Sequence, residues 1–120
     1  MKPDLSGVIF MKKRAYERIP SNVKVDFFCS NAMYTGTLKN VSKSGMCIDT
    51  DTCFPLKSEF EVRIPFNNEV IEVPVKVRRL IKTDDYYSGI GVELVNSHDK
   101  YGEFVGSLMW NHFNGMDTQS

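Results

Sequence analysis

Two short polar segments hold the residues of this sequence best suited to bind an anion or the edge of a base. The first, Lys12-Lys13-Arg14-Ala15-Tyr16-Glu17-Arg18, gathers four cations and one anion. Arginine offers a planar fork of donors that can pair with the O6/N7 edge of guanine, grip a phosphate or stack on a base, whereas lysine can do only part of this. We expect this segment to be the main local attractor of anions; the alternative is a solvated basic run that begins a domain.

The second segment, Asn40-Val41-Ser42-Lys43-Ser44-Gly45, combines an amide, two hydroxyls and a glycine. Asn40 and Ser42 share one strand parity, so we expect their side chains to point together toward a base edge. Gly45 is expected to let the backbone turn sharply and come close to a ligand. The alternative is ordinary turn chemistry, which uses the same residue types.

Net charge restricts the partners of the chain. Its 120 residues include 15 lysines and arginines and 15 aspartates and glutamates, which gives a formal net charge of zero at pH 7. No overall field attracts a nucleic acid polymer or an anionic membrane surface, so any anion binding must be local. No segment reaches the roughly 18 apolar residues of a spanning helix, and residues 1–11 lack the apolar core of a secretory signal. We expect a cytoplasmic protein with no membrane insertion.

The sequence shows no pattern typical of a metal site or a catalytic centre. The cysteines are odd in number and unpaired by any C-x-x-C spacing, so we expect ordinary thiols and no metal. Neither histidine lies in the polar segments, and the adjacent aspartates fit a solvated turn better than a catalytic pair. We therefore expect a protein that is not an enzyme and that has no cofactor. The residues concerned are Cys29, Cys47, Cys53, Asp84, Asp85, His98 and His112.

From Val23 onward the hydrophobic residues alternate with a period of two, and turn residues recur every eight to twelve positions, which is typical of a β-sandwich or barrel. Ser30-Asn31 and Asn67-Asn68 have the composition of tight turns between strands. The consecutive strands favour a closed barrel. The expected strands cover residues 23–30, 32–39, 45–49, 60–66, 69–82 and 89–94.

The fifth expected strand contains an irregularity. Its hydrophobic residues occupy every second position as far as Val77, but Leu80 is an odd number of positions further on and would face outward in a regular strand. We therefore predict a β-bulge near Arg78-Arg79. Pro74 cannot donate to a ladder, so it is expected to face outward at a strand edge or an interrupted pairing.

After the strands the hydrophobic period becomes helical. Asn96 or Ser97 is the expected N-cap, with Asp99 in the first turn. Gly102 and Gly106 weaken this helix, so it must pack on the barrel. The expected organisation is an N-terminal arm (1–11), one domain (12–113) and a polar tail (114–120). The expected apolar stripe of the helix is Tyr101, Phe104, Val105, Leu108 and Phe113.

In combination, the two polar segments follow the order Arg-x-x-x-Arg, then Asn-x-Ser-x-x-Gly, with Gly89-Ile90-Gly91-Val92-Glu93-Leu94 leading into the helix. In this order the chain resembles the PilZ domain family from about Lys12 to Met109. The resemblance implies a mainly β fold, a six-stranded antiparallel β-barrel of the split-barrel type with a C-terminal α-helix. It also implies that the ligand is cyclic di-GMP, bound as one molecule or as a self-stacked pair.

The resemblance also implies the site residues. Arg14 and Arg18 would clamp the guanines and phosphates, and Lys13 would add charge. Asn40 and Ser42 would meet the edge of a guanine, and Gly45 would allow close backbone approach.

Two positions depart from the family pattern. Many members have aspartate where this chain has Asn40, and an asparagine brings only one acceptor oxygen where a carboxylate brings two. Some members place a base-stacking aromatic on the fifth strand, where this chain has Arg78 or Arg79; an arginine plane can take that role.

The resulting hypothesis is a receptor that relays a cyclic di-GMP signal to a protein partner. The ligand is expected to draw the segment 12–18 against the barrel and create a surface for that partner. The first alternative is a PilZ-like interaction module that does not bind the nucleotide. The second is a barrel that binds single strands, which is disfavoured because Phe27, Phe60 and Phe66 fall on core phases.

Overall fold

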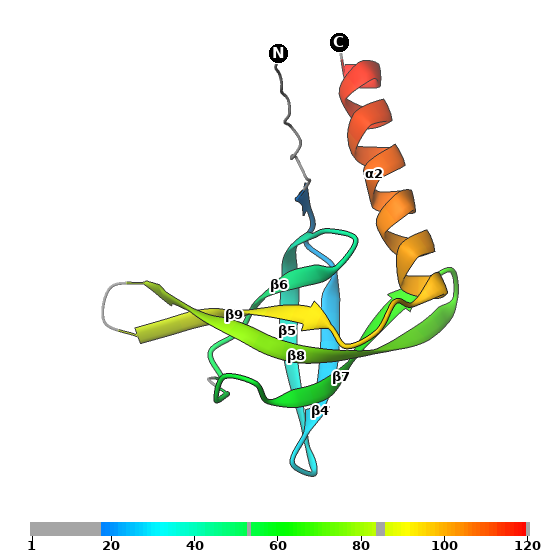
Figure 1. The fold of residues 1–120 in the computed structure, drawn as a ribbon. Helices are drawn as coiled ribbons and strands as arrows, with labels where there is room; N and C mark the ends of the chain where they lie inside the picture. Colours follow the sequence, from blue (N-terminus) through cyan, green and yellow to red (C-terminus); the bar gives the residue numbers. More distant parts are fainter. Residues whose placement is uncertain (1–17, 53, 84–85, 120) are drawn as a thin grey trace, which may run out of the picture.

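The computed structural model describes residues 18–52, 54–83 and 86–119 as a mainly β protein with a C-terminal helix (Figure 1). The expectations for Lys13, Arg14, Cys53, Asp84, Asp85 and the arm 1–11 concern residues outside these ranges. The elements are β3 (Ile19–Pro20), β4 (Lys24–Cys29), β5 (Ala32–Val41), β6 (Gly45–Asp49), β7 (Glu59–Phe66), β8 (Glu69–Thr83), β9 (Tyr86–Leu94) and α2 (Asp99–Gln119).

The strands β4 to β9 close into an antiparallel barrel. The sheet order is β3-β5-β4-β7-β8-β9-β6, and an additional pairing of β5 with β6 closes the ring. Closure is possible because β5 is long: its first half pairs with β4 and its second half pairs with β6. The predicted fold class is therefore confirmed. The two-residue strand β3, which pairs with the end of β5, was not expected from the sequence.

Tight turns join two of the hairpins where the sequence predicted them. Ser30 and Asn31 have φ values of 53° and 66°, and Asn67 and Asn68 have 54° and 63°. Positive φ at both central residues is the geometry of a type I′ turn, whose twist matches that of the flanking strands, and asparagine tolerates it well. The turns fix the register of β4 with β5 and of β7 with β8.

The predicted bulge in β8 is confirmed. Val77 pairs with Val92 of β9, but the next registered pair is Arg79 with Gly91, so Arg78 is the extra residue. The bulge returns Leu80 to the core side, opposite Ile90, and leaves two consecutive arginines exposed on the outer face. A second bulge in β5, between Leu38 and Asn40, was not expected from the sequence.

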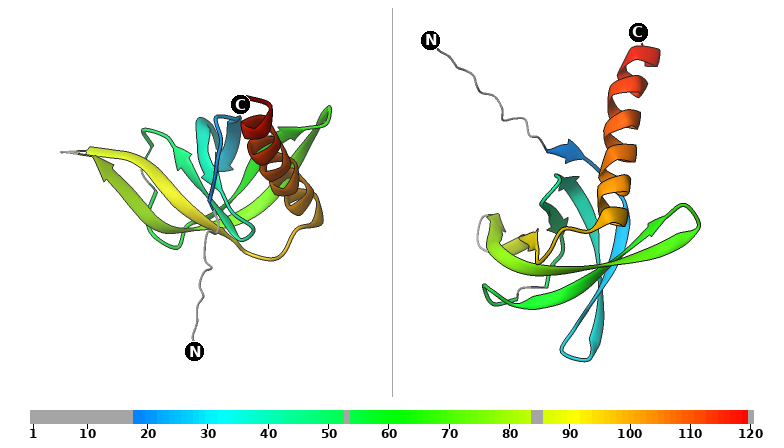
Figure 2. Two further views of the ribbon diagram at one scale, coloured as in Figure 1. Left: turned by 90° about the horizontal axis from the view of Figure 1, so that it is seen from above. Right: turned by 45° about the vertical axis from the view of Figure 1, so that its right-hand side comes forward.

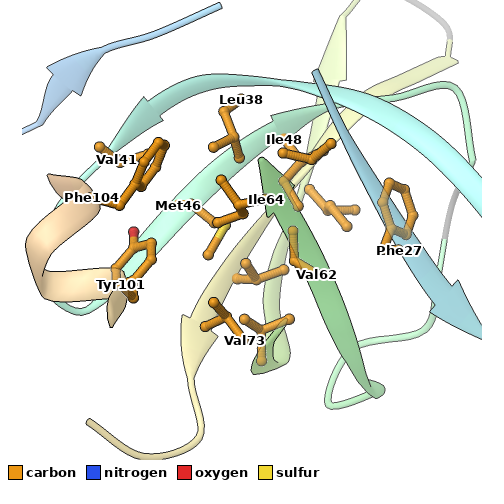
Figure 3. Packing of buried hydrophobic residues seen from close by; sticks show 14 of the residues in the cluster. Phe27, Leu38, Val41, Met46, Ile48, Val62, Ile64, Val73, Tyr101 and Phe104 are labelled. Carbon is orange, nitrogen blue, oxygen red and sulfur yellow. The ribbon is translucent and has the colours of Figure 1, made fainter. Parts of the chain in front are cut away.

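Alternating strand residues form one continuous core inside the barrel (Figure 3). The aromatic rings of Phe27, Phe54 and Phe60 contact one another. Helix α2 closes the core at the end away from Phe27 with Tyr101 and Phe104, which are 0% and 2% exposed (Figure 3). Both helix residues therefore belong to the core.

Helix α2 differs from its prediction at both ends. Its N-cap is His98 rather than Asn96 or Ser97, because the Tyr101 backbone N–H donates to His98 Nδ1 at 3.1 Å. Since Nδ1 accepts this bond, Nε2 carries the proton and donates to Glu72 O at 3.0 Å.

The far end of α2 rises away from the barrel (Figure 2). The helix ends at Gln119, beyond the expected boundary at residue 114. Phe113, predicted for the apolar stripe, is instead 55% exposed. The stripe fails there because the barrel offers no surface that far along the helix axis. Across the described ranges, no helix combines the length and apolar character needed to cross a membrane.

Gly45 provides the first testable prediction, because the structure gives it a packing role. A Cβ at Gly45 would lie 2.5 Å from Val92 O in the neighbouring strand, and the Gly45 backbone is not in the left-handed region. Gly45→Ala should therefore separate β6 from β9 and lower the free energy of unfolding by about 1–3 kcal/mol. Thermal and urea denaturation measure this loss.

The matched control is Gly102→Ala, because a Cβ at Gly102 meets nothing within 4 Å. It should leave stability unchanged or raise it by up to about 1 kcal/mol through helix propensity. Equal stability of Gly45→Ala and wild type would show that the β6–β9 contact is not tight.

Candidate functional site

The short strand β3 brings the two polar segments of the sequence together. Ile19 pairs with Val41 and Pro20 pairs with Asn40, so the chain enters the barrel beside the end of β5. Arg18, just before this pairing, donates from Nη1 to Asn40 Oδ1 at 3.0 Å. One arginine of the basic segment and the asparagine of the second segment are therefore in direct contact.

A row of registered residues crosses the outer face of the barrel from this contact. Asn40 of β5 pairs with Cys47 of β6, Cys47 with Gly91 of β9, and Gly91 with Arg79 of β8. Because adjacent strands lie about 4.8 Å apart, the row spans about 14 Å. The row begins at the side-chain amide of Asn40 and ends at the guanidinium of Arg79, and Gly91 lies next to Arg79 within it.

Gly91 shapes this row because it has no side chain. An ideal Cβ at Gly91 would lie 2.9 Å from both Cγ and Nε of Arg79. The Arg79 side chain therefore lies flat across the Gly91 backbone instead of pointing straight out into solvent. The glycine thus determines where the Arg79 guanidinium is held.

These residues border a shallow cavity of about 230 Å³. Pockets that enclose drug-sized ligands measure about 300–1,000 Å³, so a ligand the size of a dinucleotide would lie partly outside this cavity. The lining residues are Arg18, Ser44, Gly45, Arg78, Arg79, Gly91, Val92 and Glu93.

The cavity is locally cationic although the chain is neutral. Three guanidinium groups and one carboxylate line it, and Arg78 Nε lies 3.2 Å from Glu93 Oε1. That ion pair is exposed and contributes little to stability, but it engages Arg78 and leaves Arg18 and Arg79 as the cations facing the cavity. Such an arrangement favours an anion with planar groups, because guanidinium binds phosphate and stacks on rings.

Cys47 lies within this row but has no features of a reactive thiol. Burial raises its pKa, and this effect exceeds the opposing influence of the Arg79 and Arg18 charges. The thiol therefore stays protonated near neutral pH. Over the described ranges, no three His, Cys, Asp or Glu side chains are placed to share a metal ion.

The loop between β5 and β6 is held from two sides. Ser42 N donates to Gly45 O, and Leu94 N of β9 donates to Ser44 O, both at 2.9 Å. From the core side, the hydroxyl of Tyr101 lies 2.9 Å from Ser42 O and 2.6 Å from Gly45 O. Hydrogen bonds to both β9 and α2 therefore hold the backbone of this loop.

The structure brings together part of the site expected from the sequence. Arg18 and Asn40 touch, and Gly45 lines the cavity, but Gly45 is needed there mainly because β9 is so close. Ser42 is half-buried and does not line the cavity; its carbonyl faces Tyr101. Lys13 and Arg14 lie outside the described residues.

Three residues at the site have roles that the sequence did not reveal. Gly91 accommodates the side chain of Arg79, and this pairing depends on the register that the bulge sets. Glu93 forms the ion pair that engages Arg78. Tyr101 had been assigned to the helix stripe, and nothing in the sequence connects it with a loop 56 or more positions earlier.

Comparison with known proteins places this geometry in a family. The sequence matches the family model described as PilZ domain over residues 12–106. No curated protein matches the sequence significantly.

Several solved structures share the fold. The Bacillus subtilis inhibitor of motility (MotI/DgrA) has a TM-score of 0.72 and 15% identity, covering 87% of this chain and 53% of that one. The PilZ domain of YcgR from Escherichia coli, solved with c-di-GMP, has a TM-score of 0.66 and 12% identity, covering 90% and 97%. MrkH of K. pneumonia in its apo state has a TM-score of 0.69 and 12% identity, covering 94% and 57%. The chain thus spans little more than half of MotI and MrkH.

The buried phenol of Tyr101 predicts a pH dependence of stability. Burial raises its pKa above the ordinary value, and the Arg18 charge and the hydrogen bond to Ser42 only partly oppose this. Above pH 10 or so the unfolded chain releases the proton while the folded chain keeps it, so folding loses stability as pH rises. The stability advantage of wild type over Tyr101→Phe should be full below about pH 9 and shrink between about pH 10 and 11.

Urea denaturation of both proteins across this range measures the difference, and the other tyrosines cancel because both proteins contain them. A gap between the two proteins that stays constant up to pH 11 would contradict the buried, hydrogen-bonded phenol.

Proposed function

The chain belongs to the PilZ domain family, and from this premise we propose that it is a receptor for cyclic di-GMP. The observation that carries the proposal is the contact of Arg18 with Asn40 at the edge of a cationic cavity. It joins the two family motifs in space and supplies donors for both bases and phosphates. The likeness to a PilZ domain solved with c-di-GMP supports this choice of ligand.

In this proposal Arg18 and Asn40 recognise a guanine together. Asn40 Oδ1 already accepts a bond from Arg18, so the Nδ2 amino group of Asn40 is the part directed to a ligand. That group donates, and guanine O6 and N7 accept. The chain would therefore bind the edge of guanine that carries the acceptors. An aspartate in place of Asn40 has only acceptor oxygens, so it would need an edge that carries donors.

Arg79 is the better candidate for stacking on a base. Arg78 is engaged by Glu93, whereas the Arg79 side chain lies flat over Gly91 at the cavity floor. A guanidinium that lies along the surface beside the cavity is placed to stack on a ring. Arg79 thus takes the place of the aromatic residue found on this strand in some members of the family.

Known magnitudes indicate that the described residues are only part of the site. Micromolar binding corresponds to about −8 kcal/mol, and one good bidentate base contact or one stacked base contributes about 1–3 kcal/mol. Arg18, Asn40 and Arg79 together fall short of that total. We assign the remainder to Lys13 and Arg14 of the basic segment, which the family resemblance names as ligand-binding residues.

The same residues suggest how the signal leaves the domain. A ligand held between the cavity and the segment 12–18 would fasten that segment to the barrel and offer a new surface to a protein partner. In this proposal the protein is a cytoplasmic, non-catalytic relay. The partner would recognise the loaded form and not the chemistry of the nucleotide.

Calorimetric titration with cyclic di-GMP tests the proposal. Wild type should bind, and Arg18→Ala should bind at least 10-fold more weakly, because it loses a charge-assisted contact worth about 1.5–3 kcal/mol. Arg14→Ala should have an effect of similar size.

The matched control is Arg63→Ala. Arg63 lies on β7, pairs with Glu72 and does not line the cavity, so its loss should leave affinity unchanged. Absence of heat with wild type would favour the alternative of an interaction module without a nucleotide ligand.

The Arg79 assignment leads to a separate prediction. Gly91→Ala should displace the Arg79 side chain, because the new Cβ would meet only that flexible group at under 3 Å. Affinity should fall about 5- to 100-fold, the size of one stacking contact, with little change in the melting temperature.

Arg79→Ala and the double variant complete the cycle. If Gly91 acts through Arg79, Gly91→Ala should cost no further affinity in the Arg79→Ala background. Additive losses would show that Gly91 acts independently, through backbone approach to the ligand.

A further inference from the structure

Tyr101 joins the ligand loop to helix α2 through the interior of the protein. Its ring is fully buried at the end of the core where α2 meets β5 and β6 (Figure 3). Its hydroxyl lies within hydrogen-bond distance of two loop carbonyls, those of Ser42 and Gly45. One hydroxyl has one hydrogen, so both carbonyls share a single donor.

This contact lies directly beneath the candidate site. Gly45 and Ser44 line the cavity on the outer side of the loop, while the carbonyls of Ser42 and Gly45 turn inward to Tyr101. Arg18 is close enough for its charge to act on the Tyr101 phenol. The same short loop therefore faces the ligand on one side and α2 on the other.

Removal of the Tyr101 hydroxyl would take this donor away from Ser42 O in a part-buried region, whereas Gly45 O would keep its bond from Ser42 N. Loss of a hydrogen-bond donor from a shielded carbonyl costs free energy, and the loop would relax to recover a bond elsewhere. Such a relaxation would change the backbone that borders the cavity. The hydroxyl thus determines loop geometry as well as adding stability.

Helix α2 is attached to the barrel near its start and free toward its end. His98 binds the β8 backbone through Glu72 O, and Phe104 packs edge-on against Phe66 with ring centroids 5.5 Å apart. Farther along, Trp110 and Phe113 are 68% and 55% exposed. A small change at the attached end would therefore move a long, unsupported helix end (Figure 1).

We propose that Tyr101 is a positioning residue for the nucleotide site, and that through it occupancy of the site controls how firmly helix α2 is attached to the barrel. The inference rests on the proposed function, since it requires a ligand at the outer face of the loop. Coupling of this kind is reciprocal: if α2 holds the loop for the ligand, then the ligand holds α2 to the barrel by the same factor. The helix becomes a second output of the receptor, besides the segment before β3.

The test compares wild type, Tyr101→Phe and Val105→Ala at a temperature where all three are folded. Tyr101→Phe should bind cyclic di-GMP about 3- to 10-fold more weakly in calorimetry, the effect of one neutral hydrogen bond. Val105→Ala removes buried methyl groups from the same helix but no hydrogen-bonding group, so it should lose stability but keep wild-type affinity. The comparison separates positioning from general destabilisation.

Hydrogen exchange provides the readout of coupling. Cyclic di-GMP should slow amide exchange over residues 99–109 in wild type and in Val105→Ala, and this protection should be reduced in Tyr101→Phe. The wild-type measurement does not depend on any variant folding correctly.

The outcomes are distinct. Equal affinity of Tyr101→Phe and wild type, or no ligand-induced protection of residues 99–109 in wild type, would overturn the inference and leave the receptor function intact. Absence of cyclic di-GMP binding by wild type would instead remove the proposed function, and this inference with it.

Discussion

The candidate site depends on one short interaction, the pairing of β3 with the end of β5. Two residue pairs, Ile19 with Val41 and Pro20 with Asn40, are enough to direct the chain to the barrel edge where Asn40 lies. Because Arg18 directly precedes β3, its side chain lies close enough to Asn40 to donate a hydrogen bond to it. The packing of Ile19 in the core holds this ladder in place, because Ile19 is only 5% exposed. A hydrophobic anchor, Ile19, therefore sets the position of the Arg18 guanidinium next to it in the chain.

Two bulges build the remainder of the site from regular strands. One in β5 precedes Asn40 and one in β8 precedes Arg79, so each re-aims polar residues on the outer face while the inner face stays apolar. The glycine between them, Gly91, lets the Arg79 side chain lie down across the sheet. The same strands thus contribute apolar residues to a continuous core on their inner face and polar residues to the candidate site on their outer face.

Much of this architecture could be predicted from the sequence, and the failures have physical causes. Alternation and paired turn residues predicted the strands, and the parity break at Leu80 predicted the β8 bulge. The β5 bulge escaped because its sign is that Leu38 and Val41 are both buried on opposite parities, and the expected strand ended at Lys39, before Val41. The strand β3 escaped because two residues carry no period, and His98 was missed as N-cap because capping is usually inferred from Ser, Thr, Asp and Asn.

We propose that a cyclic dinucleotide binds at one outer face of the barrel, between Arg18 and Arg79, and mapping that face in solution tests this directly. Backbone amide shifts of ¹⁵N-labelled protein titrated with cyclic di-GMP report contact residue by residue. We expect the largest changes at Arg18, at residues 40–45 and around Arg79 and Gly91. Saturable changes confined to β4 and β7, on the other side of the barrel, would contradict it.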